Sequence, residues 1–268
     1  MRSKKKLLIT GAAGEIGCVL RAGLYDGYTL RLLDKRAQSA RAGEECVTAD
    51  LGDMVALHGA MRDVDCIVHL AGVPREGAWD AILPDNVMGT YNLFEAARMA
   101  GVKRVIFASS NHVIGYYRAT QSVGISEPAR PDSRYGVSKA FGEALGRMYA
   151  DKYGLEVACL RIGSFRAKPQ DARQLATWIS HRDMVALTRC CIEAPAFHFL
   201  VLYGVSNNTR NRWQNPHAAM IGYRPLDNAE QYAAELESKR PPAGDPAEDF
   251  HGGAFCALEF VGDSRRIE

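Results

Sequence analysis

The sequence predicts an α/β fold of the Rossmann type, in which a doubly wound parallel sheet carries helices on both faces. Two observations carry this prediction. Short apolar runs alternate with segments of helical spacing through the first two-thirds of the chain, and a glycine-rich turn directly follows the first run. Strands separated by helices of this length form right-handed crossover units on a sheet covered on both faces. The composition agrees, because 268 residues with 47% hydrophobic and 24% charged side chains are typical of a globular protein with a large core.

Six apolar runs bounded by turn residues are predicted strands, at 5–10, 29–34, 45–50, 66–70, 104–108 and 156–162. Between them, apolar residues three and four positions apart predict helices over 16–25, 54–61, 87–99 and 135–153. Beyond Arg166 the regular alternation of strand and helix patterns ends. There the pattern predicts helices over 171–180, 183–193 and 228–238 and a strand over 197–205. We therefore expect residues 1–165 to form a dinucleotide-binding core that includes the catalytic residues, with 166–268 as a small substrate-binding region packed on it.

Charge and cysteine usage narrow the class of protein. Thirty-three Lys and Arg residues oppose 31 Asp and Glu residues, which gives no electrostatic case for a nucleic-acid partner. The apolar run at 7–9 is too short for a signal peptide or a membrane span. Seven cysteines are an odd number without C-x-x-C spacing, and the scattered histidines lack the spacing of metal ligands. We expect a cytoplasmic enzyme with reduced thiols, no metal and no membrane partner.

The segment Gly11-Ala12-Ala13-Gly14-Glu15-Ile16-Gly17 links the first predicted strand to the first predicted helix. Glycines allow a tight turn and a close approach of the backbone to a pyrophosphate, which the N–H groups at the helix N-terminus can bind. Asp34 ends the second strand, 17 residues after Gly17, where a carboxylate can accept hydrogen bonds from both ribose hydroxyls. Because this carboxylate would repel a 2′-phosphate, NAD is favoured, although Lys35 and Arg36 follow directly and leave NADP open.

Further candidates for the cofactor site lie at the carboxyl ends of predicted strands, where ligands bind in such sheets. They are Asp50 and Leu51 on the adenine side, the small-residue turn Leu70-Ala71-Gly72, and Ile162. For Asp50, a helix-capping or turn aspartate is an equally good interpretation.

Tyr135 and Lys139 begin the longest predicted helix. A spacing of four residues places the two side chains on one helix face, where the ammonium can act on the phenol. A tyrosine that works as a base near neutral pH needs its pKa lowered by about 3 units, which is roughly 4 kcal/mol. A nearby ammonium and a cationic nicotinamide together can supply this shift.

The chain resembles the extended short-chain dehydrogenase/reductase superfamily, also known as the NAD-dependent epimerase/dehydratase family, from Gly11 through about Ser164. Besides the glycines and Asp34, the resemblance rests on Asn86, on Ala108-Ser109-Ser110 and on Tyr135 with Lys139. Ser110 lies 25 residues before Tyr135, at the end of the fifth strand, as the family's catalytic serine does. The resemblance implies that Ser110, Tyr135 and Lys139 are catalytic and that Tyr135 and Lys139 also bind NAD. Asn86 is equally well interpreted as a helix cap.

Five less general stretches are similar to bacterial uronate dehydrogenases, at 109–117, 131–143, 161–164, 178–181 and 250–255. Those enzymes oxidise galacturonate or glucuronate at C1 with NAD and yield an aldarolactone. The resemblance implies this activity for a small sugar-acid substrate, and it suggests a homo-oligomer. The chain departs from the pattern at Val73-Pro74-Arg75, where we expect a serine able to touch the sugar. Which uronate is preferred therefore stays open.

Two other functions compete with a sugar-acid dehydrogenase. A nucleotide-sugar epimerase or dehydratase would use the same three catalytic residues, but only about a hundred residues follow the predicted core to enclose a nucleoside diphosphate. A non-enzymatic dinucleotide sensor would have no use for Ser110, Tyr135 and Lys139 together.

A uronate differs from a neutral hexose by its carboxylate, which an arginine can bind with two parallel hydrogen bonds. The candidates are Arg75, Arg166, Arg173 and Arg182. We favour Arg173, which matches a position where uronate dehydrogenases keep an arginine; a solvated helix-surface arginine is the alternative interpretation. Ser110, Asn111 and His112 are further candidates for substrate contacts, and Phe255 is a candidate to close over the sugar ring.

Overall fold

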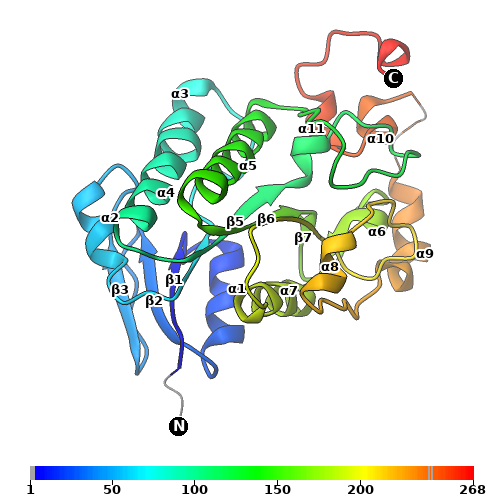
Figure 1. Ribbon diagram of the computed structural model, residues 1–268. Helices are drawn as coiled ribbons and strands as arrows, with labels where there is room; N and C mark the ends of the chain where they lie inside the picture. The colour runs from blue at the N-terminus through cyan, green and yellow to red at the C-terminus, as the bar shows by residue number, and fades with distance from the viewer. Residues whose placement is uncertain (1–3, 241, 243) are drawn as a thin grey trace.

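The computed structural model describes residues 4–240, 242 and 244–268, and its centre is a parallel sheet of seven strands (Figure 1). The strands are β1 (Lys6–Thr10), β2 (Thr29–Asp34), β3 (Glu44–Thr48), β4 (Cys66–His69), β5 (Arg104–Ser110), β6 (Glu156–Ile162) and β9 (Phe199–Gly204). Their order across the sheet is β3-β2-β1-β4-β5-β6-β9, and every neighbouring pair is parallel. This arrangement confirms the predicted fold class. The strand order reverses beside β1, where ligands bind in doubly wound sheets.

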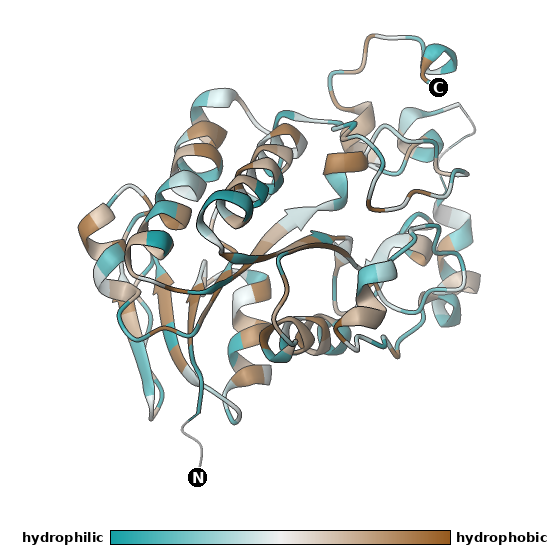
Figure 2. Cartoon of the chain, viewed as in Figure 1, coloured by the Kyte–Doolittle hydropathy of each residue, from teal (hydrophilic) through white to brown (hydrophobic). Residues whose placement is uncertain are grey.

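Alternate residues of each strand point to opposite faces of the sheet, and both faces are buried. In β1, Leu7 and Ile9 pack into one hydrophobic core and Leu8 into the other. The first core lies under α1 (Glu15–Leu24) and α7 (His181–Glu193), and the second lies under α2 (Met54–Ala60), α4 (Gly89–Met99) and α5 (Arg134–Tyr153). Figure 2 shows hydrophobic residues along the central strands and mixed faces on the covering helices.

The structure corrects several predicted boundaries. The segment 171–180 is not one helix: α6 (Gln174–Thr177) has four residues, and β8 (Trp178–Ile179) follows and pairs with β7 (Ser164–Phe165). Tertiary hydrogen bonds cause this break, because the Trp178 indole donates to the carbonyl of Arg166 and the Trp178 carbonyl accepts from Ser206. The segment 228–238 is likewise split, into 3₁₀ turns at Ala229–Tyr232 and Glu237–Lys239 around α9 (Ala233–Leu236).

The predicted helix over 87–99 has a more complex start than its spacing indicates. Helix α3 (Trp79–Ile82) leads into a π-helical turn, Leu83–Met88, and α4 begins only at Gly89. The strand β5 continues two residues past its predicted end and thereby includes Ser110.

The part of the chain beyond residue 165 contributes to two regions. Strand β9 and helix α7 extend the sheet and cover it, whereas α8 (Pro216–Met220), α10 (Pro246–Asp249) and α11 (Ala254–Ala257) lie in longer loops (Figure 1). The tail returns to the carboxyl edge of the sheet, where Arg118 and Phe250 form an isolated bridge. The division of the chain at residue 165 stays a prediction. Among the described helices, none is both long and apolar enough to span a bilayer.

Candidate active site

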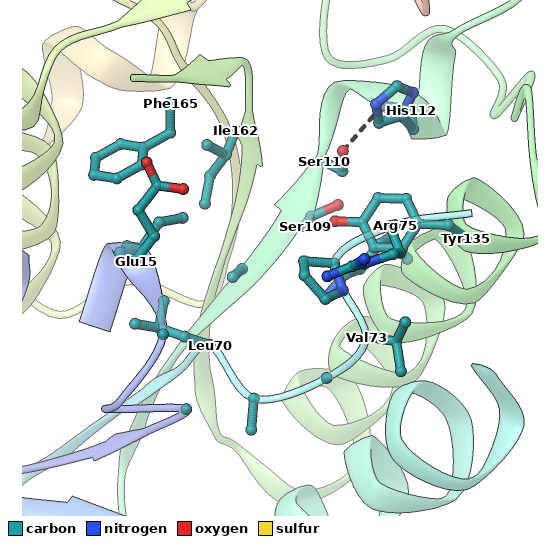
Figure 3. Close-up of a pocket in the computed structure, with 18 of the residues that line it drawn as sticks. Glu15, Leu70, Val73, Arg75, Ser109, Ser110, His112, Tyr135, Ile162 and Phe165 are labelled. Carbon is teal, nitrogen blue, oxygen red and sulfur yellow. Dashed lines mark hydrogen bonds between the residues drawn. The ribbon is translucent and has the colours of Figure 1, made fainter. Parts of the chain in front are cut away.

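A cleft of about 1130 Å³ follows the carboxyl ends of the strands (Figure 3). Its walls come from the turn after β1, the ends of β2, β4, β5 and β6, the first turns of α5, and the C-terminal tail. All the residues assigned from the sequence to the cofactor or to catalysis, and the favoured candidates for substrate contacts, line this one cleft. They are Gly11, Gly14, Glu15, Ile16, Gly17, Asp34, Asp50, Leu51, Leu70, Ala71, Gly72, Ser110, Asn111, His112, Tyr135, Lys139, Ile162, Arg173 and Phe255.

The glycine turn after β1 forms a cradle that side chains would fill. Gly11 has a φ of +67°, and a Cβ atom there would lie 2.6 Å from the backbone nitrogen of Ala71. A Cβ atom at Gly17 would lie 2.5 Å from the carbonyl oxygen of Gly11. The turn therefore brings bare backbone against the start of α1, whose first N–H groups have no acceptor within the helix. This cradle fits the pyrophosphate of a dinucleotide.

Asp34 ends β2 with its carboxylate buried and held by backbone donors. Its two oxygens accept hydrogen bonds from the N–H groups of Ala13 and Arg36, each at 2.9 Å. The Arg36 guanidinium lies 3.5 Å from the same carboxylate, and Lys35 pairs with Asp85 at 3.1 Å. The carboxylate is thus fixed where a ribose would lie, with two cations close by.

Replacing Asp34 with alanine is expected to weaken NAD binding and to reduce the preference of the protein for NAD over NADP. The variant removes the acceptor for the ribose hydroxyls and the repulsion of a 2′-phosphate, while Arg36 and Lys35 remain. The ratio of kcat/KM values for NAD and NADP measures the effect. Asp53→Ala is the matched control, because Asp53 caps α2 outside the cleft. An unchanged ratio in Asp34→Ala would contradict this role.

Asn86 fixes the loop that follows β4. Its amide accepts from the N–H of Val73 at 2.7 Å, and it donates to the Val73 carbonyl at 3.1 Å and to the Ser138 hydroxyl at 3.0 Å. Asn86 therefore does not cap a helix, which corrects that alternative. It joins the loop to α5 one residue before Lys139.

Tyr135 and Lys139 lie in the first turns of α5, and the Lys139 ammonium is 5.6 Å from the centre of the Tyr135 ring. Burial raises the pKa of Tyr135 to about 12, against the opposing effect of a hydrogen bond with Ser110. Burial also lowers the pKa of Lys139 to about 8. The phenol is therefore protonated near neutral pH in the chain alone, and Lys139 by itself does not activate it.

Replacing Lys139 with methionine is expected to stabilise the cofactor-free protein at pH 7 by up to roughly 3 kcal/mol, the equivalent of lowering the lysine pKa from 10.5 to about 8. The folded state disfavours the charged form of Lys139, so the wild-type protein gains stability as the pH rises above about 8. Above pH 10.5, Lys139 is neutral in both the folded and the unfolded state, and its destabilising effect vanishes. Denaturant unfolding at pH 7 and pH 10 measures the gain, which should shrink at the higher pH. Lys103→Met, at an exposed lysine, is the control; a gain in Lys139→Met that is absent or independent of pH would contradict the burial effect.

Arg173 lies at the N-terminus of α6 and points into the site instead of lying on a solvated helix surface. Its guanidinium donates to the His251 carbonyl at 2.8 Å and to the Ser164 hydroxyl at 3.4 Å. With the Asn111 amide oriented to match its neighbours, Asn111 accepts from Arg173 at 2.8 Å and donates to the Ile162 carbonyl at 3.1 Å. Desolvation lowers the pKa of Arg173 from its ordinary value.

The other three candidate arginines differ in position. Arg75 and Arg166 are exposed and line the cleft. Arg182 pairs with Asp227 and does not line the cleft. The geometry thus favours Arg173 as the enclosed cation and leaves Arg75 and Arg166 at the cleft wall.

Three aromatic rings, those of Tyr135, His112 and Phe255, pack against one another at the wall of the cleft. His112 stacks on Phe255 with ring centres 3.9 Å apart, and both rings meet Tyr135 edge-on, at 5.8 Å and 6.1 Å. Phe255 comes from α11, so the C-terminal tail contributes directly to the site.

Sequence reasoning missed two carboxylates that hold this site together. Glu76 accepts from the backbone N–H of Tyr135 at 2.9 Å and pairs with Arg134 at 2.7 Å. Asp132 pairs with His112 at 2.7 Å. Asp132 lies three residues before Tyr135, inside the stretch 131–143 that resembles uronate dehydrogenases, but the resemblance assigns it no role. Glu76 is 59 residues away from Tyr135, whose backbone it binds. Nothing in the sequence pattern indicates that either carboxylate is buried.

Comparison with known proteins gives matches over most of the chain. The model of the NAD dependent epimerase/dehydratase family matches residues 7–189. Uronate dehydrogenase from Pseudomonas putida is 45% identical over 256 residues, which cover 94% of this chain and 95% of that protein. A mutant uronate dehydrogenase from Agrobacterium tumefaciens, solved with NAD, is 44% identical with a TM-score of 0.90 over 95% of this chain and 97% of that one. Glucuronic acid dehydrogenase from Chromohalobacter salexigens is 42% identical with a TM-score of 0.91, over 98% and 99% of the two chains.

Proposed function

The chain belongs to the NAD-dependent epimerase/dehydratase family, and from this premise we propose that it is an NAD-dependent uronate dehydrogenase. The reaction is the oxidation of galacturonate or glucuronate at C1 to an aldarolactone. One observation carries the proposal: a single cleft joins the glycine cradle, the Tyr135–Lys139 pair and the enclosed guanidinium of Arg173. The likeness to uronate dehydrogenases over nearly the whole chain supports it.

NAD is the cofactor, and the residues present fit its parts. The cradle from Gly11 to Gly17, which includes Glu15 and Ile16, would hold the pyrophosphate at the N-terminus of α1. Asp34 would bind the adenosine ribose. The turn Leu70-Ala71-Gly72 and Ile162 would line the nicotinamide half, and Asp50 and Leu51 the adenine.

When bound, NAD supplies the acceptor for the hydride from C1 and a positive charge beside Tyr135. The Tyr135 phenolate takes the proton of the C1 hydroxyl, and the C–H bond breaks as the C1 carbonyl forms, so that the cyclic sugar becomes a lactone. Ser110 orients the reacting oxygen and its hydrogen bond favours the phenolate. Lys139 would hold the nicotinamide ribose and would add positive charge near the phenol.

The carboxylate of the substrate would lie against Arg173, whose planar guanidinium is oriented by Ser164, Asn111 and the His251 carbonyl. His112 and Asn111 supply further polar contacts to the sugar, and Phe255 covers the ring. Pro74 lines the cleft where the uronate dehydrogenase pattern leads us to expect a serine, so the sugar contacts on that side differ.

A homo-oligomeric assembly and a cytoplasmic location stay predictions. The seven cysteines, all free thiols in the structure, support a reducing compartment.

The test is NADH absorbance after the purified protein is mixed with NAD and a panel of sugar acids. The proposal predicts net NADH with galacturonate or glucuronate and a lactone as product. Sugar product without net NADH would instead indicate an epimerase or dehydratase, and neither NADH nor product with any substrate would indicate a dinucleotide sensor. Either of these outcomes would overturn the proposal.

A further inference from the structure

Asp132 lies at the junction of three segments that build the substrate side of the cleft. Its side chain has 0% exposure. One carboxylate oxygen lies 2.7 Å from Nδ1 of His112, and the other accepts from the hydroxyl of Ser133 at 2.6 Å. Nothing in the reaction described above uses this buried carboxylate.

The chain closes tightly around the carboxylate. A Cβ atom at Gly115 would lie 1.9 Å from Oδ2 of Asp132, and one at Gly252 would lie 1.8 Å from it. The Gly252 N–H donates to the Gly115 carbonyl at 2.9 Å, so the tail is joined to the loop after β5 at this point. Two bare backbone segments therefore enclose Asp132, and solvent has no room to replace its partners.

Asp132 connects the groups that face the substrate. Through Oδ2 it holds His112, which stacks on Phe255 of the tail. Through Ser133, whose hydroxyl accepts from the N–H of Gly136 at 3.0 Å, it contacts the N-cap of the helix that carries Tyr135. One buried side chain thus connects residues of the β5 loop, of α5 and of the C-terminal tail.

The contact with Asp132 determines which ring nitrogen of His112 carries the proton. An ionised carboxylate only accepts hydrogen bonds, so Nδ1 of His112 must donate and carry the proton. In the neutral imidazole, Nε2 is then an acceptor. The charged and titratable groups near Asp132 include His112, Cys256 with its sulfur at 3.9 Å, the guanidinium of Arg173, and the phenols of Tyr116 and Tyr135. Among these groups, His112 donates a ring N–H to Asp132, and His112 also lines the cleft.

We propose that Asp132 is a positioning residue, which fixes the tautomer and orientation of His112 so that Nε2 accepts a hydroxyl of the sugar. This inference rests on the proposed function for the identity of the sugar. It assigns Asp132 no contact with the substrate, and it makes His112 a specificity residue for a hydroxyl.

A double-mutant cycle on His112 and Asp132 tests the proposal, with Asp132→Leu, His112→Ala and the double variant. We expect each single variant to lower kcat/KM for the uronate by about tenfold or more, mainly through KM, with the NAD KM within about twofold of wild type. The kcat/KM of the double variant should lie within about twofold of the kcat/KM of the less active single variant, because Asp132 acts through His112. Fully additive losses, or equal losses in NAD affinity, would overturn the proposal.

Two further variants separate positioning from a structural role. Asp132→Asn keeps an oxygen acceptor for Nδ1 and should stay within about threefold of the wild-type uronate KM. Asp183→Asn is the matched control, because Asp183 is also buried, accepts from Ser206 at 2.6 Å and lies outside the cleft. It should lower thermal stability and leave the uronate KM unchanged. Losses in Asp132→Asn as large as in Asp132→Leu, or a raised KM in Asp183→Asn, would contradict the assignment.

A readout without turnover keeps this test separate from the proposed function. Nitrogen-15 NMR of the wild type, with His112 assigned by its loss in His112→Ala, should show a proton on Nδ1 and none on Nε2 at mildly alkaline pH. The opposite tautomer would overturn the inference even in an active enzyme. A wild type inactive with every uronate would defeat the proposed function, whereas the Nδ1 tautomer would still be found.

Discussion

Replacing Tyr135 with phenylalanine is expected to cut turnover at least about a hundredfold while NAD binding stays nearly unchanged. The variant removes one hydroxyl, the proton acceptor for the C1 hydroxyl, and leaves the ring packed against His112 and Phe255. Steady-state kcat with a uronate and NAD affinity by titration measure the two quantities.

The pH dependence adds a second signature. Because burial raises the pKa of Tyr135 to about 12, only a small fraction of the phenol is ionised near neutral pH in the chain alone. The wild-type rate should therefore rise with pH through the neutral range, and Tyr135→Phe should lose this slope. Tyr149→Phe is the matched control on the same helix, since its hydroxyl bonds to Glu95 outside the cleft. Near-normal turnover in Tyr135→Phe would show that another group is the base.

The second large effect is expected at Arg173, where alanine should raise the uronate KM by roughly ten- to a hundredfold. A charge-assisted hydrogen bond contributes about 1.5–3 kcal/mol, which gives this range. The NAD affinity should hardly change, because the guanidinium contacts Ser164, Asn111 and the His251 carbonyl on the substrate side.

Two variants sharpen this prediction. Arg173→Lys keeps the charge and loses the planar fork, so its KM should lie between those of the wild type and Arg173→Ala. Arg182→Ala removes an exposed arginine outside the cleft and should leave the uronate KM unchanged. An unaltered KM in Arg173→Ala would remove Arg173 from the carboxylate site and favour Arg75 or Arg166.

The sheet was predictable because its signals are local. An apolar run that ends in Gly11, and another that ends in Asp34, need only a few residues to indicate a buried strand and a ligand at its carboxyl end. The Tyr135–Lys139 spacing is equally local, since one helix face brings both side chains together. These features place the cleft before any long-range contact is known.

The rest depends on contacts between distant segments. The spacing over 171–180 is helical, but two hydrogen bonds draw Trp178 into a strand: its indole donates to the Arg166 carbonyl, and its own carbonyl accepts from the N–H of Ser206. In the same way, no local pattern assigns a role to Glu76 or Asp132, because their roles arise from where the chain closes around Tyr135 and His112. The activation of the phenol was also not predictable from spacing, because burial of Lys139 opposes the charge that the tyrosine needs.

The most direct test of the central claim compares galacturonate with galactose, which lacks the carboxylate, as substrates of the wild-type protein with NAD. We predict net NADH from galacturonate with a kcat/KM at least about tenfold above that for galactose, because Arg173 binds only galacturonate through a charge-assisted contact. Equal kcat/KM values for the two sugars would contradict the assignment of this protein as a uronate dehydrogenase.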